Sequence, residues 1–287
     1  MTNIQSEMMT PKLNLKITKM SGSGNDFILL DNRSGIVPDL QMPLIARSLC
    51  RRMVSVGADG MIFIVSSDRY DFKWRFFNAD GSEAEMCGNG GRCAARFAFL
   101  QGIAGAAMTF ETLAGPIPSW VEGTSVKLQL TKPQDLRTER RIEVSGKPLD
   151  LDFINTGVPH ALIRVKDIET ADMAGLGPQI RYHEYFQPAG ANVNFVQLKN
   201  PGELLVRTYE RGVEGETLAC GTGSVAAAAM AFYKSEAVSP IKVHTRGGEV
   251  LTVYVEGIPD KTIEKVYLEG AVRLIFQGEV FEEALFE

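Results

Sequence analysis

Two segments of this chain are near-copies of one another, and each is built around a cysteine. The first reads NADGSEAEMCGNGGRCAARFAF around Cys87, and the second reads YERGVEGETLACGTGSVAAAAMAF around Cys220. Each has an acidic approach, then Cys-Gly-x-Gly, then an apolar, Ala-rich run that ends in Ala-Phe. The cysteines are 220 − 87 = 133 residues apart, nearly half of the 287-residue chain. The repeat predicts a duplicated fold that brings two thiols to face each other across a cleft.

The strands before the two cysteines repeat as well. KWRFFN, with Arg75, lies 132 positions before LVRTYE, with Arg207. Alternating and apolar strand patterns separated by glycine turns fill both halves, and the run after each cysteine is apolar nearly all round, as in a buried helix. We expect an α/β fold of the α+β type with two pseudo-symmetric domains. Each domain is a mixed sheet wrapped around a central apolar helix, with the active site in the cleft between them.

The division of the chain follows from changes in its pattern. Residues 1–12 lack a periodic pattern, and we interpret them as a flexible N-terminal extension. A polar segment with two prolines, KPQDLRTERRIEVSGKP, marks the crossover between the halves. We therefore expect an N-terminal domain over 13–132, which carries Cys87, and a C-terminal domain over 133–272, which carries Cys220. An amphipathic helix is expected over 44–53 in the first half.

The composition excludes several classes of protein. A net charge of −5 and a pI near 5.4 argue against nucleic acid as the main partner. No run of about 18 apolar residues predicts a membrane span, and the N-terminus lacks the apolar region of a secretory signal. Four cysteines in so long a chain do not make a disulfide scaffold, so a reducing cytoplasm is the expected location.

A cysteine at the first position of a buried helix has a special chemistry. The unpaired N–H groups of the first turn and the helix dipole favour the thiolate. The glycines that follow, among them Gly88 and Gly221, leave the backbone bare, so that an anionic group can approach those N–H groups. The N–H groups of two such helix starts would bind one carboxylate from both sides, with a sulfur on each face of the α-carbon. That arrangement can remove a proton from one face and deliver one to the other.

Other interpretations of the cysteines are weaker. Cys50 and Cys93 lie within helix patterns and are expected to be core residues. The spacing of Cys87 and Cys93 and the scarcity of histidines argue against zinc, so no metal is expected. Neither repeat has the Lys-Ser/Thr pair of a phosphate loop, and the GSG of residues 22–24 lacks the rest of a dinucleotide motif. A cysteine hydrolase using His160 stays open, but it leaves the second thiol unexplained.

The chain resembles the diaminopimelate epimerase family. The resemblance rests on MSGSGNDF, VGADG, FFNADGSEAEMCGNGGRC, NTGVPH, NVNF and YERGVEGETLACGTG, which occur in the family's order. It implies a cofactor-independent isomerase that interconverts LL- and meso-diaminopimelate on the pathway to lysine and peptidoglycan. It implies no pyridoxal phosphate, a small-molecule substrate and a homodimer. It also implies that the C-terminal strand, over 273–287, returns to the N-terminal domain.

The resemblance assigns roles residue by residue. Cys87 and Cys220 match the two catalytic thiols, one acting as base and the other as acid. His160 and Glu210 match groups that tune the thiols. The residues that match substrate-binding positions are Asn25, Asn78, Gly88, Asn89, Asn192, Glu210, Arg211, Gly221 and Thr222. Taken without the resemblance, Asn25 and Asn192 also suit turns, and Glu210 with Arg211 suits a surface ion pair.

Two positions depart from the pattern of some family members. Val158 stands where some carry Asn before Pro-His, and Gly60 stands where some carry Gln after Ala-Asp. Both changes fall where ligand contacts would be made, either to the distal carboxylate or near the cleft rim. Two rival classes remain open. One comprises proline or hydroxyproline racemases and phenazine-type isomerases of the same architecture, and the other is a non-catalytic amino-acid binding protein.

Overall fold

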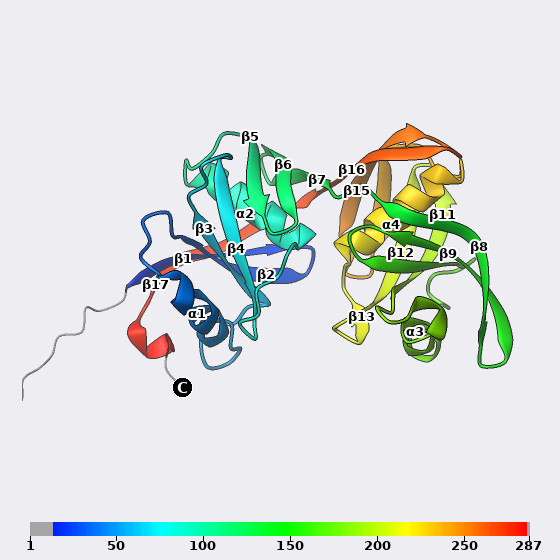
Figure 1. Cartoon of the computed structure of the whole chain (residues 1–287), viewed down its shortest axis with the longest axis horizontal. Coiled ribbons are helices and arrows are strands. Elements are labelled where there is room, and N and C mark those ends of the chain that lie inside the picture. The colour runs from blue at the N-terminus through cyan, green and yellow to red at the C-terminus, as the bar shows by residue number, and fades with distance from the viewer. Residues whose placement is uncertain (1–13, 286–287) are drawn as a thin grey trace, which may run out of the picture.

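The computed structural model describes residues 14–285, so the extension expected over 1–12 lies outside the described residues. The described chain forms two lobes that lie side by side (Figure 1). The first lobe, here called the N-lobe, contains β1 (Leu15–Gly22), β2 (Asn25–Asp31), α1 (Met42–Leu49), β3 (Gly60–Val65), β4 (Phe72–Asn78), α2 (Gly88–Leu100), β5 (Ala107–Thr112), β6 (Gly115–Glu122), β7 (Ser125–Leu130) and β17 (Arg273–Val280).

The second lobe, here called the C-lobe, follows after a crossover at residues 131–133. It contains β8 (Gln134–Val144), β9 (Lys147–Asn155), β10 (Pro159–Arg164), α3 (Met173–Arg181), β11 (Asn192–Asn200), β12 (Glu203–Glu210), β13 (Gly215–Thr217), α4 (Gly221–Tyr233), β14 (Ile241–Thr245), β15 (Val250–Ile258) and β16 (Thr262–Ala271). Short 3₁₀ turns lie at Asp39–Gln41, Glu184–Phe186 and Glu282–Leu285.

Strand pairing repeats from lobe to lobe. In the N-lobe the order is β1–β2–β3–β4–β5–β6–β7, where β2–β3 and β4–β5 are parallel and the other pairs antiparallel. In the C-lobe the order is β9–β10–β11–β12–β14–β15–β16, where β10–β11 and β12–β14 are parallel and the other pairs antiparallel. The helices also occupy matching positions in the two lobes. α1 and α3 precede the third strand of each order, β3 and β11, while α2 and α4 precede the fifth, β5 and β14. The two-domain α+β fold predicted from the repeat is therefore confirmed.

The lobes are joined by strands as well as by the crossover. β7 pairs with β16 in an antiparallel ladder from Ser125–Ala271 to Leu130–Val266. Beyond it the chain runs back as β17 and pairs with β1 (Figure 1). We propose that the lobes are the two expected domains, divided between residues 132 and 133, with β17 belonging to the first.

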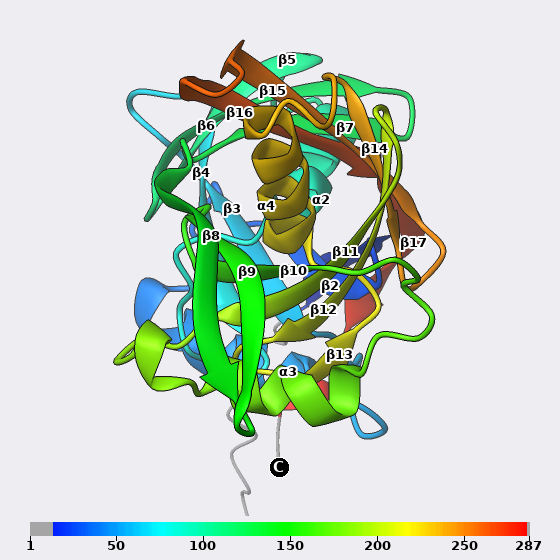
Figure 2. The same ribbon diagram turned by 90° about the vertical axis from the view of Figure 1, so that its right-hand side faces the viewer.

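Each lobe is built around its Ala-rich helix. In α4 every residue from Gly223 to Phe232 is buried, and strands of the C-lobe surround the helix (Figure 2). The buried part of α2 packs in the same way against Phe27, Trp74, Phe110 and Leu128. Small side chains allow such close helix–sheet contact, which explains the frequent glycine and alanine residues in both helices. Within the described residues, no helix is long and apolar enough to cross a membrane.

One local expectation is wrong, and two elements, β8 and α3, were not predicted from the sequence. The helix expected over 44–53 ends at Leu49, because Gly57 N–H bonds to the Leu49 carbonyl and turns the chain back. The polar crossover segment forms strand β8. Helix α3 has no clear apolar pattern and contains Pro178, but Asp172 caps it by accepting a hydrogen bond from Gly175 N at 2.9 Å.

Candidate active site

Both repeated cysteines are N-cap residues of the central helices. Cys87 Sγ accepts a hydrogen bond from Gly90 N at 3.4 Å, and Cys220 Sγ accepts one from Gly223 N at 3.4 Å. Both residues have extended backbone angles, as N-caps do. The local geometry expected from the sequence is therefore present in each lobe.

The two helix starts meet between the lobes. Leu268 Cδ2, on β16, lies 3.5 Å from where a side chain at Gly88 would begin and 3.1 Å from the same point at Gly221. Asn89 Oδ1 lies 3.5 Å from that point at Gly221. Beside them is a cavity of about 310 Å³ lined by both lobes, including Cys87, Gly88, Thr131, Thr156, Val158 and Thr222. The duplication thus places both motifs at one junction.

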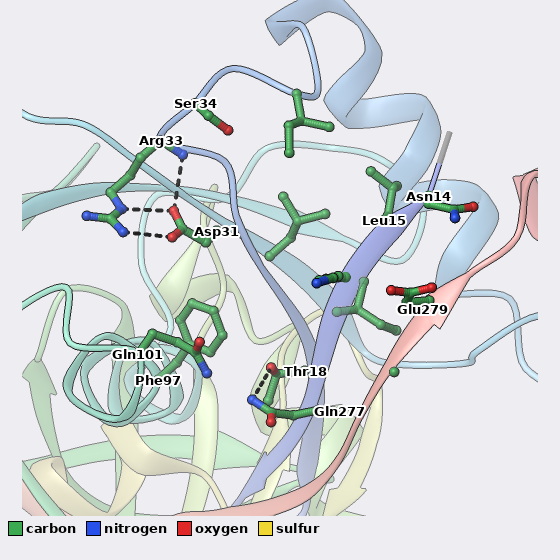
Figure 3. A pocket seen from close by; sticks show the side chains of 15 residues that line it. Asn14, Leu15, Thr18, Asp31, Arg33, Ser34, Phe97, Gln101, Gln277 and Glu279 are labelled. Atoms are coloured by element: carbon green, nitrogen blue, oxygen red, sulfur yellow. Dashed lines mark hydrogen bonds and ion pairs between the residues drawn. The ribbon is translucent and has the colours of Figure 1, made fainter. Parts of the chain in front are cut away.

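A larger groove, of about 1020 Å³, lies elsewhere. It runs along β1 and β17, where Arg33 pairs with Asp31 and Gln277 donates to Thr18 (Figure 3). None of its lining residues is a cysteine or a residue that the sequence assigns to the site. The smaller cavity between the lobes is therefore the better candidate for the active site.

The ionisation of the thiols differs from the sequence-based expectation. Burial raises the pKa of Cys87, although the Gly90 and Asn89 amides and the Arg92 charge act in the opposite direction. Burial, helped by the nearby charge of Glu210, raises the pKa of Cys220 to about 12. The helix start alone was expected to favour the thiolate. The first-turn amides act in that direction at both cysteines, but loss of hydration outweighs them, so the net effect is a raised pKa.

Asn25, the first residue of β2, and Asn89, the second residue of α2, are in contact. Asn89 Nδ2 donates to Asn25 Oδ1 at 2.7 Å, and Asn25 Nδ2 donates to Asp59 Oδ2 at 2.9 Å. Asn78 stays apart from them. It is exposed at the end of β4, where its Nδ2 donates to Ser82 Oγ at 3.0 Å within its own turn.

Asn192 and Arg211 are also in contact. Asn192 Oδ1 accepts from the backbone N–H of Arg211 at 2.9 Å, and its Nδ2 donates to Pro159 O at 3.0 Å. The Arg211 guanidinium donates to Ala189 O at 3.1 Å. Glu210 lies near the thiols, since its charge acts on both, and burial raises its pKa. Glu210 and Arg211 are not paired with each other, so the surface ion-pair interpretation has no support here.

His160 lies fully buried on β10. Its Nδ1 lies 3.1 Å from Asn194 Nδ2, and its Nε2 has no hydrogen-bond partner among the described residues. Burial, together with the nearby Arg211 charge, lowers the pKa of His160 to about 3. The ring is therefore neutral at physiological pH. Asn194 also accepts from Thr208 Oγ1 at 2.9 Å, and its Oδ1 lies so close to Gly223 that a side chain there would collide with it.

The two departures from the family pattern differ in their structural setting. A side chain at Gly60 would begin 2.6 Å from the Phe76 ring and 2.7 Å from the Phe77 carbonyl, so this position has no room for a ligand residue. Val158 lines the cavity beside Cys87. Val158 thus presents an apolar side chain to the cavity, whereas the space at Gly60 is already filled by the core.

The repeated arginines hold the segments that lead to the thiols. Arg75 forms a bidentate ion pair with Glu83 through Nε and Nη2, with Nη2 and Oε2 3.0 Å apart. Arg207 forms the same bidentate pair with Glu216. Each arginine lies on the strand before its cysteine, and each glutamate lies on the segment between that strand and the cysteine. The motif thus repeats an anchoring ion pair as well as the helix start.

Sequence reasoning missed four residues of the site. They are Arg92, Thr156, Asn194 and Thr208, all of them buried. Asn194 had a signal, because it lies two residues after Asn192 on the same face of a strand. Arg92 had one too, as the single charge within the buried part of an apolar helix. Thr156 Oγ1 donates to the Thr222 carbonyl at 3.3 Å and so fixes the start of α4.

The fold is shared with solved proteins of low sequence identity. A phenazine biosynthesis protein from Bacillus anthracis superposes with a TM-score of 0.70 at 18% identity, covering 93% of this chain and 99% of that one. A hydroxyproline epimerase from Agrobacterium vitis gives 0.69 at 16% identity, covering 96% and 94%. The fold thus places the chain in a structural class of pseudo-symmetric, two-domain proteins that includes epimerases.

Sequence similarity narrows the class. The family model for diaminopimelate epimerase matches residues 17–134 and 153–274. A diaminopimelate epimerase from Aquifex aeolicus is 45% identical over 282 residues, which is 94% of this chain and 99% of the relative. One from Chlorobaculum tepidum is 40% identical over 265 residues, covering 91% and 99%. The chain belongs to the diaminopimelate epimerase family, and its class of enzyme is isomerase.

Proposed function

We propose that this chain interconverts LL- and meso-diaminopimelate by a two-base mechanism that uses Cys87 and Cys220 and no pyridoxal phosphate. The observation that carries the proposal is the pair of N-cap thiols, one from each lobe, at a single junction. One thiolate removes the α-proton and the other thiol delivers a proton to the opposite face. After turnover the protonation states are exchanged, and the reverse reaction uses the same pair.

The helix starts supply the electrostatics of the reaction. The N–H groups of Gly88–Asn89 and Gly221–Thr222 are proposed to bind the reacting carboxylate and the charge that develops on it. Because burial keeps both thiols neutral without substrate, the base must be generated on binding. The α-ammonium group of the substrate supplies a positive charge near the sulfur, which favours the thiolate.

The distal end of the substrate needs a second set of contacts. Arg211 offers a fork for a carboxylate, and Glu210 offers a counter-charge for an ammonium group. Asn25, Asn78 and Asn192 are proposed as further substrate-binding residues. Asn25 lies beside Asn89 at the start of α2, Asn192 lies beside Arg211, and Asn78 lies apart from both at the end of β4. His160 and Glu210 are proposed to tune the thiols, His160 as a neutral donor through Nε2 and Glu210 through its charge.

The proposed setting follows from the same interpretation. We propose a cytoplasmic enzyme of lysine and peptidoglycan precursor biosynthesis that works as a homodimer and does not bind nucleic acid. The dimer is supported by β17, where Leu274, Ile275 and Phe276 are all exposed. A three-residue apolar run on one strand favours contact with another protein surface. Light scattering of the wild type and of Phe276→Glu tests this surface.

Solvent deuterium exchange tests the function directly. The enzyme is incubated with LL-diaminopimelate in D₂O, and the α-deuterium content and the stereoisomers are measured over time. We expect deuterium to enter together with formation of the meso isomer. L-Proline, trans-4-hydroxy-L-proline and L-lysine serve as comparison substrates and should exchange poorly. Fast exchange of any of these without reaction of diaminopimelate would favour a rival racemase. Binding of diaminopimelate without exchange would favour a binding protein.

A further inference from the structure

Arg92 is a fully buried cation in the otherwise apolar helix α2. Its Nη2 donates to Asn89 Oδ1 at 2.9 Å and to Ser23 Oγ. Its Nε and Nη1 have no hydrogen-bond partner among the described residues, and no ion pair forms with it there. Burial lowers the pKa of Arg92, which shows that the charge is in an unfavourable environment.

The fold makes room for this guanidinium. A side chain at Gly22, on β1, would begin 3.7 Å from Arg92 Nη2, and one at Gly270, on β16, would begin 3.2 Å from Nε. A side chain at Gly270 would therefore crowd the guanidinium, whereas one at Gly22 would make an ordinary van der Waals contact with it. A buried charge without a counter-charge is unfavourable, and an apolar side chain of similar size would suit a purely structural position better. The charge therefore needs a function.

Arg92 begins a chain of hydrogen bonds that passes through the side-chain amides of Asn89 and Asn25, and the donor-to-acceptor direction is the same at every step. Arg92 can only donate, so the oxygen of Asn89 must face it. The Nδ2 of Asn89 then faces Asn25 Oδ1, and the Nδ2 of Asn25 faces Asp59 Oδ2. Asp59 only accepts, so neither end of the chain can be reversed. Both amide oxygens are used within the protein, and each NH₂ group retains one N–H for an acceptor.

This chain of hydrogen bonds lies at the junction of the helix starts. Asn89 is the second residue of α2, and its Oδ1 lies 3.5 Å from where a side chain at Gly221 would begin. The Arg92 charge also acts on the Cys87 sulfur and opposes the effect of burial on its pKa. One buried cation thus acts on both the amides and the thiol of the N-lobe half of the site.

We propose that Arg92 is a positioning residue for the N-lobe half of the site. It fixes Asn89 and Asn25 with their N–H groups available to a carboxylate of the substrate, and its positive charge adds to that of the substrate ammonium in favouring the Cys87 thiolate. The substrate part of this inference rests on the proposed function. The effect on Cys87 can be measured without any substrate.

The experiment compares three variants with the wild type, all of them full-length. Arg92→Met removes the charge and the hydrogen bonds, while Arg92→Lys keeps the charge. Arg96→Met is the matched control, because Arg96 lies on the next turn of α2 and donates to the carbonyls of Gly123 and Val272. Circular dichroism and thermal melting identify folded protein. The first readout is the rate of Cys87 alkylation by iodoacetamide against pH, measured by peptide mass spectrometry.

We expect Arg92→Met to slow Cys87 alkylation about tenfold at pH 8 and to move its pH profile upward, since one pKa unit is a tenfold change in thiolate. Arg92→Lys should recover most of the alkylation rate, and Arg96→Met should match the wild type. An Arg92→Met profile that coincides with the wild type overturns the proposal. If Arg92→Met does not fold, Arg92→Gln replaces it as the uncharged variant, with the same expected upward displacement of the Cys87 profile by about one pH unit. A folded Arg92→Gln protein whose profile coincides with that of the wild type would overturn the proposal.

The second readout is epimerisation of diaminopimelate by a double-mutant cycle. Arg92→Met and Asn89→Ala should each lower kcat/KM by about 10- to 100-fold, the range for losing a hydrogen bond to a charged group. Because Arg92 and Asn89 belong to the same chain of hydrogen bonds, kcat/KM of the double variant should be no lower than that of the less active single variant. Additive losses would mean that Arg92 does not act through Asn89. A wild type that is inactive with diaminopimelate refutes the proposed function, whereas the alkylation result still decides the role of Arg92 at Cys87.

Discussion

Asn194 Nδ2 donates to Nδ1 of His160 across 3.1 Å, and this contact determines the tautomer of the buried ring. The orientation of the Asn194 amide is fixed, because its Nδ2 also donates to Ala161 O and its Oδ1 accepts from Thr208. Nδ1 of His160 therefore accepts, and the proton of the neutral ring is on Nε2. That N–H is buried and has no partner among the described residues.

The neutral ring has a consequence for stability. The pKa of His160 falls from 6.5 to about 3 on folding, so the unfolded chain binds one more proton between these values. Stability is full above pH 6.5 and is lost as the pH falls toward 3, by up to about 1.4 kcal/mol per pH unit. Urea unfolding of His160→Gln should show a smaller decline between about pH 6 and 4 than the wild type. His183→Gln is the control, and equal slopes in the wild type and His160→Gln would contradict the prediction.

The two N-cap thiols should be equally necessary. Cys87→Ala and Cys220→Ala should each lower epimerisation by at least about 10²- to 10⁴-fold, the usual contribution of a positioned acid or base. Cys50→Ala and Cys93→Ala should keep most activity, because both residues are core residues. Activity is followed by chiral chromatography of the product. A folded Cys93→Ala enzyme as inactive as Cys87→Ala would mean that the roles are misassigned.

Thiol labelling should reflect burial. In the free enzyme, alkylation of Cys220 should keep increasing through about pH 10, because its pKa is raised to about 12. The same peptide in urea should level off above a pKa near about 8.5. The measurement is mass spectrometry of iodoacetamide-treated protein at a series of pH values. A plateau below about pH 9 for native Cys220 would show that the helix start dominates over burial after all.

The two departures from the family pattern should respond differently to reversal. Gly60→Gln should destabilise the fold by about 1–3 kcal/mol, since its side chain would meet the Phe76 ring and the Phe77 carbonyl. Val158→Asn should keep the fold and lower KM for diaminopimelate by about two- to tenfold, the value of one hydrogen bond. Unfolding curves and steady-state kinetics check both. A Gly60→Gln protein as stable as the wild type would remove the steric argument.

The sequence by itself determined the duplication, the two central helices and the place of both cysteines at helix starts. These features follow from local sequence pattern, because Cys-Gly-x-Gly before an apolar run places the cysteine at the N-terminus of the helix that the run forms. The same local signals failed for α3, whose Gly175, Gly177 and Pro178 disfavour a helix that its Asp172 cap and its packing against the sheet nevertheless stabilise. Sequence similarity added the family and its candidate residues.

Only the tertiary structure decided the ionisation and the hydrogen-bond partners of those residues. The pKa of Cys87 depends on how much water the packed lobes exclude, which no segment of sequence contains. Arg92 meets Asn89 within its own helix, but Asn89 meets Asn25 across 64 positions. His160 likewise obtains its tautomer from Asn194, 34 positions away. Burial and long-range contacts set charge and orientation, because both depend on surroundings that form only when the strands pair.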